Sequence, residues 1–229
     1  MSPAVPSADR GSDSLRDLKG LYAVTPDEFD TAALVRKVRL ALAGGARLVQ
    51  YRNKSAHAAL RREQGAALLA ICRDVGVPLI VNDDLELTET LGADGLHLGR
   101  EDLPVAAARV RLGPGKILGA SCYDRLDLAS NARAAGADYV AFGSAFVSAT
   151  KPNATRAPLS LYRKAKLSLA CPIVAIGGIT VENTRPLVDA GADAVAVISA
   201  LFDAPNVEDR AREFAGMFHR HDLEKRTAV

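Results

Sequence analysis

Residues 135–148 read AGADYVAFGSAFVS, and this stretch contains the pattern that decides the fold. A Gly-Ala-Asp turn closes a helix-like segment, and the short apolar run YVAFGSAF opens directly after it. A brief run of Val, Ala and aromatic residues between turn signals is typical of a strand buried in a parallel sheet. The stretch therefore predicts the end of a helix, a buried strand and then a loop that begins at Ser148.

The same alternation continues along the chain. Further apolar runs have this form, namely GLYAVTP, ARLVQYR, PLIVNDD, GLHLG, KILGASC, PIVAIGG and AVAVISAL. The segments between them, such as TAALVRKVRLALAGG, carry apolar residues at spacings of three and four, which predicts helices. Strand–helix units of this number in 229 residues favour a closed (β/α)8 TIM barrel over the alternative, an open doubly wound sheet.

A weak internal repeat supports a single barrel made of four similar quarters. Gly-containing turns that close a helix and open a strand begin at Ala43, Leu91, Ala135 and Ala190. Such turns are common between a helix and a strand, so the repeat indicates fold and not function. No internal linker interrupts it. The expected parts are a flexible N-terminal tail at 1–19, a barrel domain at 20–218 and a flexible C-terminal tail at 219–229.

The composition excludes several classes of function. The net charge is +2 with both signs mixed along the chain, unlike the basic surface of a nucleic-acid-binding protein. Cys72, Cys122 and Cys171 lie far apart, which argues against a zinc site and for reduced thiols. No apolar run approaches the ~18 residues of a membrane span, and we expect no secretory signal because the first residues contain no apolar stretch. We expect a cytoplasmic protein without nucleic-acid or membrane partners, and a homo-oligomer is compatible with the sequence.

Polar residues stand where the second strand ends. Active sites of such barrels lie at the C-terminal ends of the strands. Gln50, Arg52 and Lys54 share one face if the strand persists that far, and together they would hold an anionic, hydrogen-bonding ligand. The alternative is that Arg52 and Lys54 are solvated charges on the rim.

Carboxylates follow the third and fourth strands. Asp83 and Asp84 come after one strand and Asp102 after the next, so neighbouring strands would bring Asp83 and Asp102 together. A pair of carboxylates with phosphate oxygens and water is a common Mg²⁺ site. The alternative is that these residues cap the helices that follow, which suits Asp84 better than Asp83.

The remaining strand ends offer hydroxyls and glycines. His97 lies inside its strand and is expected to be packed and hydrogen-bonded rather than a general base. Ser121 has no evident His or Asp partner, so we expect a ligand contact and no catalytic triad. The loop from Ser148 to Thr155 is a lid or a plain solvated loop. Gly178 opens a helix after the seventh strand, where such barrels commonly bind phosphate, and a tight turn is the alternative.

Taken together, these motifs resemble thiamine-phosphate synthase (thiamine-phosphate pyrophosphorylase). The matching elements are QYRNK, the ND after the third strand, HLGREDLP, GAS, FGSAFVSATK, IGGI and VIS, which occur in this order, each at a strand end. The match covers Gly20 to Leu201. The family usually has Thr at the position of Ser148. Serine retains the hydroxyl of threonine and lacks its methyl group.

The resemblance implies a transferase that couples 4-amino-2-methyl-5-pyrimidinylmethyl diphosphate to a thiazole phosphate, with Mg²⁺. Thiamine phosphate and pyrophosphate would be the products of a dissociative substitution. Carried over by position, the expected catalytic residues are Arg52, Lys54, Ser121 and Lys151. The pyrimidine diphosphate would be bound by Gln50, Tyr51, Arg52, Asn53, Lys54, Asn82, Ser121 and Lys151. The thiazole phosphate would be bound by Ser148, Ala149, Thr150, Gly178, Ile198 and Ser199. One Mg²⁺ per subunit would be held by Asp83 and Asp102.

Three other functions compete with this interpretation. A tautomerase-like relative would isomerise the thiazole, but the intact QYRNK, the Asp83 and Asp102 pair and SATK argue against it. A sugar-phosphate epimerase or isomerase needs a placed acid and base, and the sequence offers only His97 and scattered carboxylates. A non-catalytic sensor of thiamine precursors would have little need for a metal that activates a leaving group.

Overall fold

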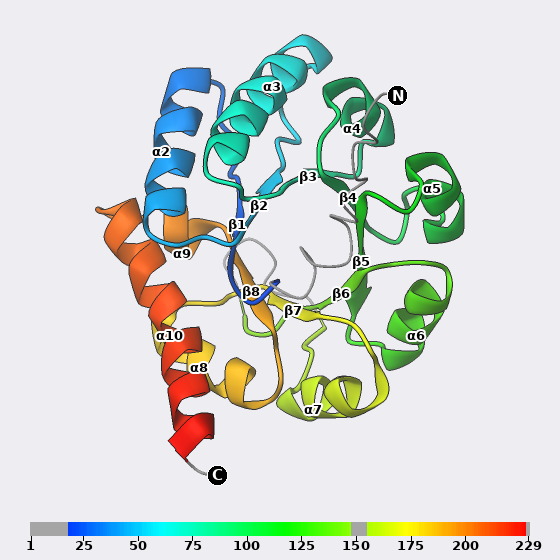
Figure 1. Cartoon of the computed structure of the whole chain (residues 1–229), viewed down its shortest axis with the longest axis vertical. Helices are drawn as coiled ribbons and strands as arrows, with labels where there is room; N and C mark the ends of the chain where they lie inside the picture. Colours follow the sequence, from blue (N-terminus) through cyan, green and yellow to red (C-terminus); the bar gives the residue numbers. More distant parts are fainter. Residues whose placement is uncertain (1–17, 148–154, 228–229) are drawn as a thin grey trace, which may run out of the picture.

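The computed structural model describes residues 18–147 and 155–227, with side chains as far as His219. Parallel strands close a barrel in the order β1 to β8, with β1 paired to β8 (Figure 1). This confirms the predicted single-domain (β/α)8 architecture. The strands are β1 Gly20–Val24, β2 Leu48–Tyr51, β3 Leu79–Asn82, β4 Gly95–Leu98, β5 Ile117–Tyr123, β6 Tyr139–Phe142, β7 Ile173–Ile176 and β8 Ala194–Val197.

Helices form the outer layer around the strands (Figure 1). They are α2 Thr31–Ala43, α3 Ala58–Asp74, α4 Leu85–Leu91, α5 Val105–Leu112, α6 Leu126–Ala134, α7 Leu159–Ser168, α8 Val181–Asp189, α9 Ser199–Phe202 and α10 Val207–Thr227. The last helix packs against α2 and α8. It continues to Thr227. Most of the segment 219–229, predicted to be a flexible tail, is therefore helical.

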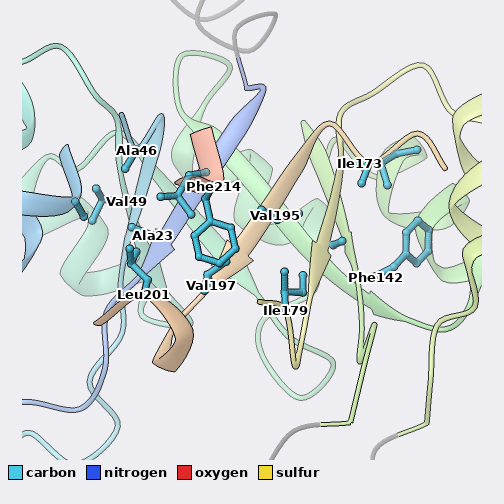
Figure 2. Packing of buried hydrophobic residues seen from close by; sticks show 14 of the residues in the cluster. Ala23, Ala46, Val49, Phe142, Ile173, Ile179, Val195, Val197, Leu201 and Phe214 are labelled. Carbon is cyan, nitrogen blue, oxygen red and sulfur yellow. The ribbon is translucent and has the colours of Figure 1, made fainter. Parts of the chain in front are cut away.

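Strand alternation divides the buried side chains into an inner and an outer set. Tyr22, Ile80 and Val174 belong to the inner set, which fills the barrel. The strand residues between them face outward and pack against the helices. Figure 2 shows part of this outer layer, in which Val195 of β8 and Phe214 of α10 belong to one cluster. Because both faces of each strand are buried, the strands read as nearly continuous apolar runs.

The repeated turns have a structural role at the N-terminal ends of the strands. The Asp94 carboxylate accepts a hydrogen bond from Leu79 N at 2.9 Å. Asp138 accepts one from Leu118 N at 2.8 Å, and Asp193 one from Ile173 N at 2.9 Å. In each case the turn aspartate binds the backbone of the preceding strand. The repeat therefore indicates fold and not function, as expected from the sequence.

Candidate active site

The C-terminal strand ends bring the predicted polar residues together on one rim. Asn82 of β3 is in register with His97 of β4, and Gln50 of β2 lies opposite Ile80 of β3. Leu48 and Ile80 face the interior of the barrel. Because side chains two positions apart on a strand share a face, Gln50 faces the interior as well. The interior positions of β2 to β5 thus end in an amide, a second amide, an imidazole and a hydroxyl.

A chain of hydrogen bonds crosses the barrel interior beneath this rim. The Gln50 amide donates to the Tyr22 hydroxyl at 2.8 Å, and the Tyr22 and Tyr139 hydroxyls are 2.8 Å apart. The Tyr139 hydroxyl is 2.9 Å from His97 Nδ1, and His97 Nε2 is 2.9 Å from Ser121 Oγ. The expectation that His97 is packed and hydrogen-bonded is confirmed.

The expectation that Ser121 has no His partner is wrong, because His97 lies directly beside it. Residues on neighbouring strands β4 and β5 meet here although 24 positions separate them in the chain. The other imidazole nitrogen is held by Tyr139, in the place that a carboxylate takes in a Ser-His-Asp triad. The pair therefore lacks the third member that would make Ser121 a nucleophile.

Burial keeps the imidazole and the phenols neutral. It lowers the pKa of His97 to about 4, against the opposing effect of the nearby Asp102 charge. Burial also raises the pKa of Tyr22 and of Tyr139 above the ordinary value. A neutral imidazole has one N–H and one acceptor nitrogen, so His97 donates to one of its two partners and accepts from the other.

The lowered pKa of His97 predicts a loss of stability in acid. The unfolded chain takes up a proton near the ordinary pKa of 6.5, and the folded protein does so only near 4. The free energy of unfolding should be unaffected by this group above pH 6.5 and should fall as the pH drops toward 4, by roughly 2 kcal/mol at pH 5. Urea unfolding of the wild type and His97→Gln at pH 7, 6 and 5 measures it. Parallel losses in the two proteins would contradict a neutral buried His97.

The QYRNK segment contains both buried and partly exposed residues. β2 ends at Tyr51, so strand alternation does not extend to Lys54. Tyr51 and Asn53 are buried, and both bind Gln64 of α3. The Arg52 guanidinium is 3.2 Å from Asp27, and its side chain is partly exposed. Gln50 is also buried and donates to Tyr22, so the Arg52 guanidinium and the Lys54 ammonium are the charged groups of this segment that remain accessible to a ligand.

Asp83 and Asp102 meet, as the sequence predicts. Burial, a hydrogen bond to Asp102 and the Asp102 charge raise the pKa of Asp83, and Lys54 and Asn82 oppose this. The Lys54 ammonium lies 3.6 Å from Asp83. Asp83 has a φ of 62°, a left-handed conformation that is uncommon outside glycine, while its N–H donates to the His97 carbonyl at 2.8 Å. The hydrogen bond to His97 thus holds the Asp83 backbone in this conformation, next to the carboxylate that faces Asp102 and Lys54.

Helix capping accounts for only one of the three aspartates. The Asp84 carboxylate accepts from Leu87 N at 2.9 Å and caps α4. The N-cap of α5 is Pro104, and Asp102 instead accepts from Gly99 N at 2.6 Å. Asp83 and Asp102 therefore remain available to a cation.

The two carboxylates fit a divalent cation, because a positive ion would stabilise the charged form of Asp83, which burial and the Asp102 charge disfavour. In the described part of the chain, no group of three or more His, Cys, Asp or Glu side chains could hold a metal. A cation here would complete its shell with water and ligand oxygens, as Mg²⁺ commonly does. A cavity of about 380 Å³ adjoins Asp83 and is lined by Tyr51, Asn53, Lys54, Arg61, Val81, Asn82, Asp83, Asp84, Leu85 and Leu87.

A second polar region lies at the ends of β7 and β8. Gly178 has a φ of +66°, and a Cβ there would lie 2.5 Å from the Val147 carbonyl. Only glycine allows this approach. Ile198 is the N-cap of α9 and Ser199 is its first residue, directly after the neighbouring strand β8.

Four predicted residues of this region, Ser148, Ala149, Thr150 and Lys151, lie outside the described residues. The described start of their loop is held against the β7 end, because Phe146 N donates to the Gly177 carbonyl at 2.9 Å.

Comparison with known proteins identifies the family. The profile of the thiamine monophosphate synthase family matches residues 21–201. The chain belongs to this family. It is 56% identical over 199 residues to a thiamine-phosphate synthase of Thiobacillus denitrificans, covering 87% of this chain and 94% of that one. A Methylobacillus flagellatus protein of the same name is 54% identical over 206 residues, with 90% and 98% coverage.

A solved structure supports both the family and the fold. A thiamine phosphate pyrophosphorylase of Pyrococcus furiosus superimposes with a TM-score of 0.78 at 35% identity, covering 90% of this chain and 98% of that one. For this member of the thiamine monophosphate synthase family, no helix within the described ranges has the length and apolar character needed to cross a membrane. Cys72, Cys122 and Cys171 are free thiols.

Sequence reasoning missed two residues of the site of this family member, Tyr22 and Tyr139. One signal for them was present, since polar hydroxyls occur at inward positions of two otherwise apolar strands. A second signal was Gly119, a glycine inside the apolar run KILGASC, and the structure places it opposite Tyr139 in the β5–β6 pair. A glycine beside a large ring in a buried sheet marks a place where the side chain needs room.

Proposed function

We propose that this chain is a thiamine-phosphate synthase that joins 4-amino-2-methyl-5-pyrimidinylmethyl diphosphate to a thiazole phosphate. The observation that carries the proposal is the meeting of Asp83 and Asp102 beside Lys54, next to the cavity at the ends of β2 and β3. Cations and paired carboxylates in one place suit a metal diphosphate. The region around Gly178 on the other side of the rim suits a monophosphate.

The reaction requires a good leaving group on the substrate and no nucleophile from the protein. The bond between the pyrimidinylmethyl carbon and the diphosphate oxygen breaks, and its electron pair leaves with pyrophosphate. The thiazole nitrogen then donates its lone pair to that carbon and becomes the positively charged nitrogen of the product. A site for this reaction must neutralise the leaving oxygens and hold the nitrogen in line.

The described residues supply these two functions. Arg52 and Lys54 place positive charge at the diphosphate side, and the Ser121 hydroxyl contributes a hydrogen bond from the interior. Asp83 and Asp102 would hold one Mg²⁺ per subunit, which would supply positive charge for the departing pyrophosphate. Gly178, Ile198 and Ser199 would bind the thiazole phosphate. We assign Lys151 to the leaving group on the basis of the motif alone, because it lies outside the described residues.

The competing functions fit the site less well. A sugar-phosphate isomerase needs a base that takes up a proton near neutral pH. His97 has a pKa of about 4 and is held by Ser121 and Tyr139.

The free thiols support our proposal of a cytoplasmic location.

The proposal predicts a product that depends on both substrates and on the metal. Purified protein is mixed with the pyrimidine diphosphate and Mg²⁺, with or without the thiazole phosphate, while pyrophosphate and thiamine phosphate are measured. Both products should form in equal amounts, only with the thiazole phosphate present, and EDTA should abolish them. A protein that binds both compounds without forming product would be a sensor, and one that isomerises the thiazole would be a tautomerase; either result rules the proposal out.

A further inference from the structure

Five side chains from β1, β2, β4, β5 and β6 form one continuous line of hydrogen bonds through the barrel. Its two ends are Gln50 and Ser121, and its middle members are Tyr22, Tyr139 and His97. Tyr22 is 1% exposed, Tyr139 0% and His97 7%, so water cannot readily replace a missing partner. The family resemblance gives roles to the two ends and none to the three residues between them.

Counting donors and acceptors gives this line a direction. The Tyr22 oxygen accepts from the Gln50 amide, and the Tyr22 hydrogen then needs an acceptor. Within the described structure, the other hydrogen-bonding partner of this hydroxyl is the Tyr139 oxygen. Tyr22 therefore donates to Tyr139. The opposite order would leave a buried hydroxyl hydrogen without an acceptor, which is unfavourable.

The direction passes from Tyr139 through the imidazole to the serine. Tyr139 uses its own hydrogen for His97 Nδ1, which becomes the acceptor nitrogen. The neutral imidazole then carries its hydrogen on Nε2 and donates it to Ser121 Oγ. One lone pair of Ser121 is occupied in this way, and the serine hydrogen is left free to point away from His97.

The packing of Tyr139 shows that its hydroxyl is placed specifically. Its ring stacks on His97 with centroids 5.6 Å apart and an interplanar angle of 24°. A Cβ on Gly119 would lie 2.1 Å from Tyr139 Cζ and 2.4 Å from its hydroxyl oxygen. The barrel thus has a glycine where the ring crosses β5, and the ring has little freedom to move.

We propose that Tyr22 and Tyr139 are positioning residues that fix His97 as an Nε2–H donor and so present Ser121 as a hydrogen-bond donor to the substrate. A serine in this state does not act as a nucleophile. It donates to an acceptor atom of the bound substrate, such as an oxygen of the departing diphosphate. The inference rests on the proposed function, because that function puts substrate at Ser121.

The tautomer of His97 can be measured without any assay of activity. Long-range ¹H–¹⁵N NMR spectra of the full chain, with His97 assigned by comparison with His97→Gln, distinguish the two neutral tautomers. The wild type should show His97 with its hydrogen on Nε2. A hydrogen on Nδ1 would reverse the direction of the line and overturn the inference.

Two substitutions test whether the tyrosines control this state. Tyr139→Phe retains the ring and removes the hydroxyl next to His97, and Tyr22→Phe removes the hydroxyl that sets the direction. Each should convert the single His97 tautomer into a mixture and lower kcat by about tenfold, the effect of about one hydrogen bond, with a smaller change in either KM. If one variant does not fold, the other and the wild-type spectrum still decide.

Tyr162→Phe is the matched control. Tyr162 is also fully buried, and its hydroxyl donates to the Phe142 carbonyl at 3.1 Å, outside the line. It should lower Tm to a similar degree and leave kcat and the His97 tautomer unchanged. Equal kcat in the Tyr139 and Tyr162 variants would overturn the inference even if the synthase activity is present. A wild type without synthase activity but with the Nε2–H tautomer would overturn the proposed function and retain the direction of the line.

Discussion

Asp83→Asn should lower kcat/KM by about 10²–10³-fold, the usual cost of losing a charge-stabilising group in an active site. Asparagine is nearly isosteric and tolerates positive φ, so the backbone conformation of 62° at this position is retained. What is lost is one of the two carboxylates proposed to hold Mg²⁺. Steady-state kinetics at several Mg²⁺ concentrations measures the effect, and the activity that remains should require more Mg²⁺ than the wild type does.

The neighbouring Asp84→Asn is the control for this variant. Asp84 caps α4 through Leu87 N, and asparagine caps helices as well as aspartate does. The two variants change net charge equally at adjacent positions, so they differ in the metal site and not in general electrostatics. Activity of Asp84→Asn should stay within about threefold of the wild type. Similar losses in both variants would show that charge near the cavity matters and that a specific ligand does not.

Stability without metal should respond in the opposite sense to activity. The pKa of Asp83 is raised in the folded protein, so its charged form is disfavoured there at neutral pH. Removing this charge relieves the repulsion from Asp102. In EDTA, Tm of Asp83→Asn should therefore equal or exceed that of the wild type, and added Mg²⁺ should raise Tm of the wild type more. If Tm of Asp83→Asn in EDTA were far below that of the wild type, the Asp83 carboxylate would stabilise the fold itself.

The fold could be predicted because each strand–helix unit has a local signature. The turn aspartates, the short apolar runs and the helical spacing are all set by neighbours in the chain. Strand order in a barrel then follows chain order, and this alone brings Asp83 and Asp102 together. The helix beyond His219 was missed because its charged residues were read as a tail. Extending a helix that is already formed needs no new nucleation, and Leu, Glu, Lys and Arg favour it.

The interior hydrogen bonds could not be predicted in the same way. Whether Ser121 meets His97 depends on the register of β4 and β5 and on two side-chain rotamers, which tertiary packing decides. Tyr139 is brought to His97 from β6, two strands away, across the glycine of β5. The sequence pattern predicts the order of the strands, but it does not predict how far the Tyr139 ring reaches across the barrel interior.

Gly178→Ala should act mainly on the thiazole phosphate. The new Cβ would lie 2.5 Å from the Val147 carbonyl and 2.7 Å from the Phe146 carbonyl, so backbone must move where the proposed phosphate binds. We expect KM for the thiazole phosphate to rise by at least about tenfold, because backbone N–H groups at a strand end lose their position. The free energy of unfolding should fall by about 3 kcal/mol, from strain and the steric clash together.

Gly76→Ala separates these two effects. Gly76 has a φ of +68°, close to that of Gly178, but no atom lies within 4 Å of its Cβ position. It should show only the left-handed backbone penalty, about 1 kcal/mol, with both KM values unchanged. In Gly178→Ala, KM for the pyrimidine diphosphate should stay within about twofold, since Arg52 and Lys54 bind on the other side of the rim. An equal rise of both KM values would mean that the two anion regions are one site, because a local backbone shift at β7 should not reach a separate diphosphate at β2 and β3.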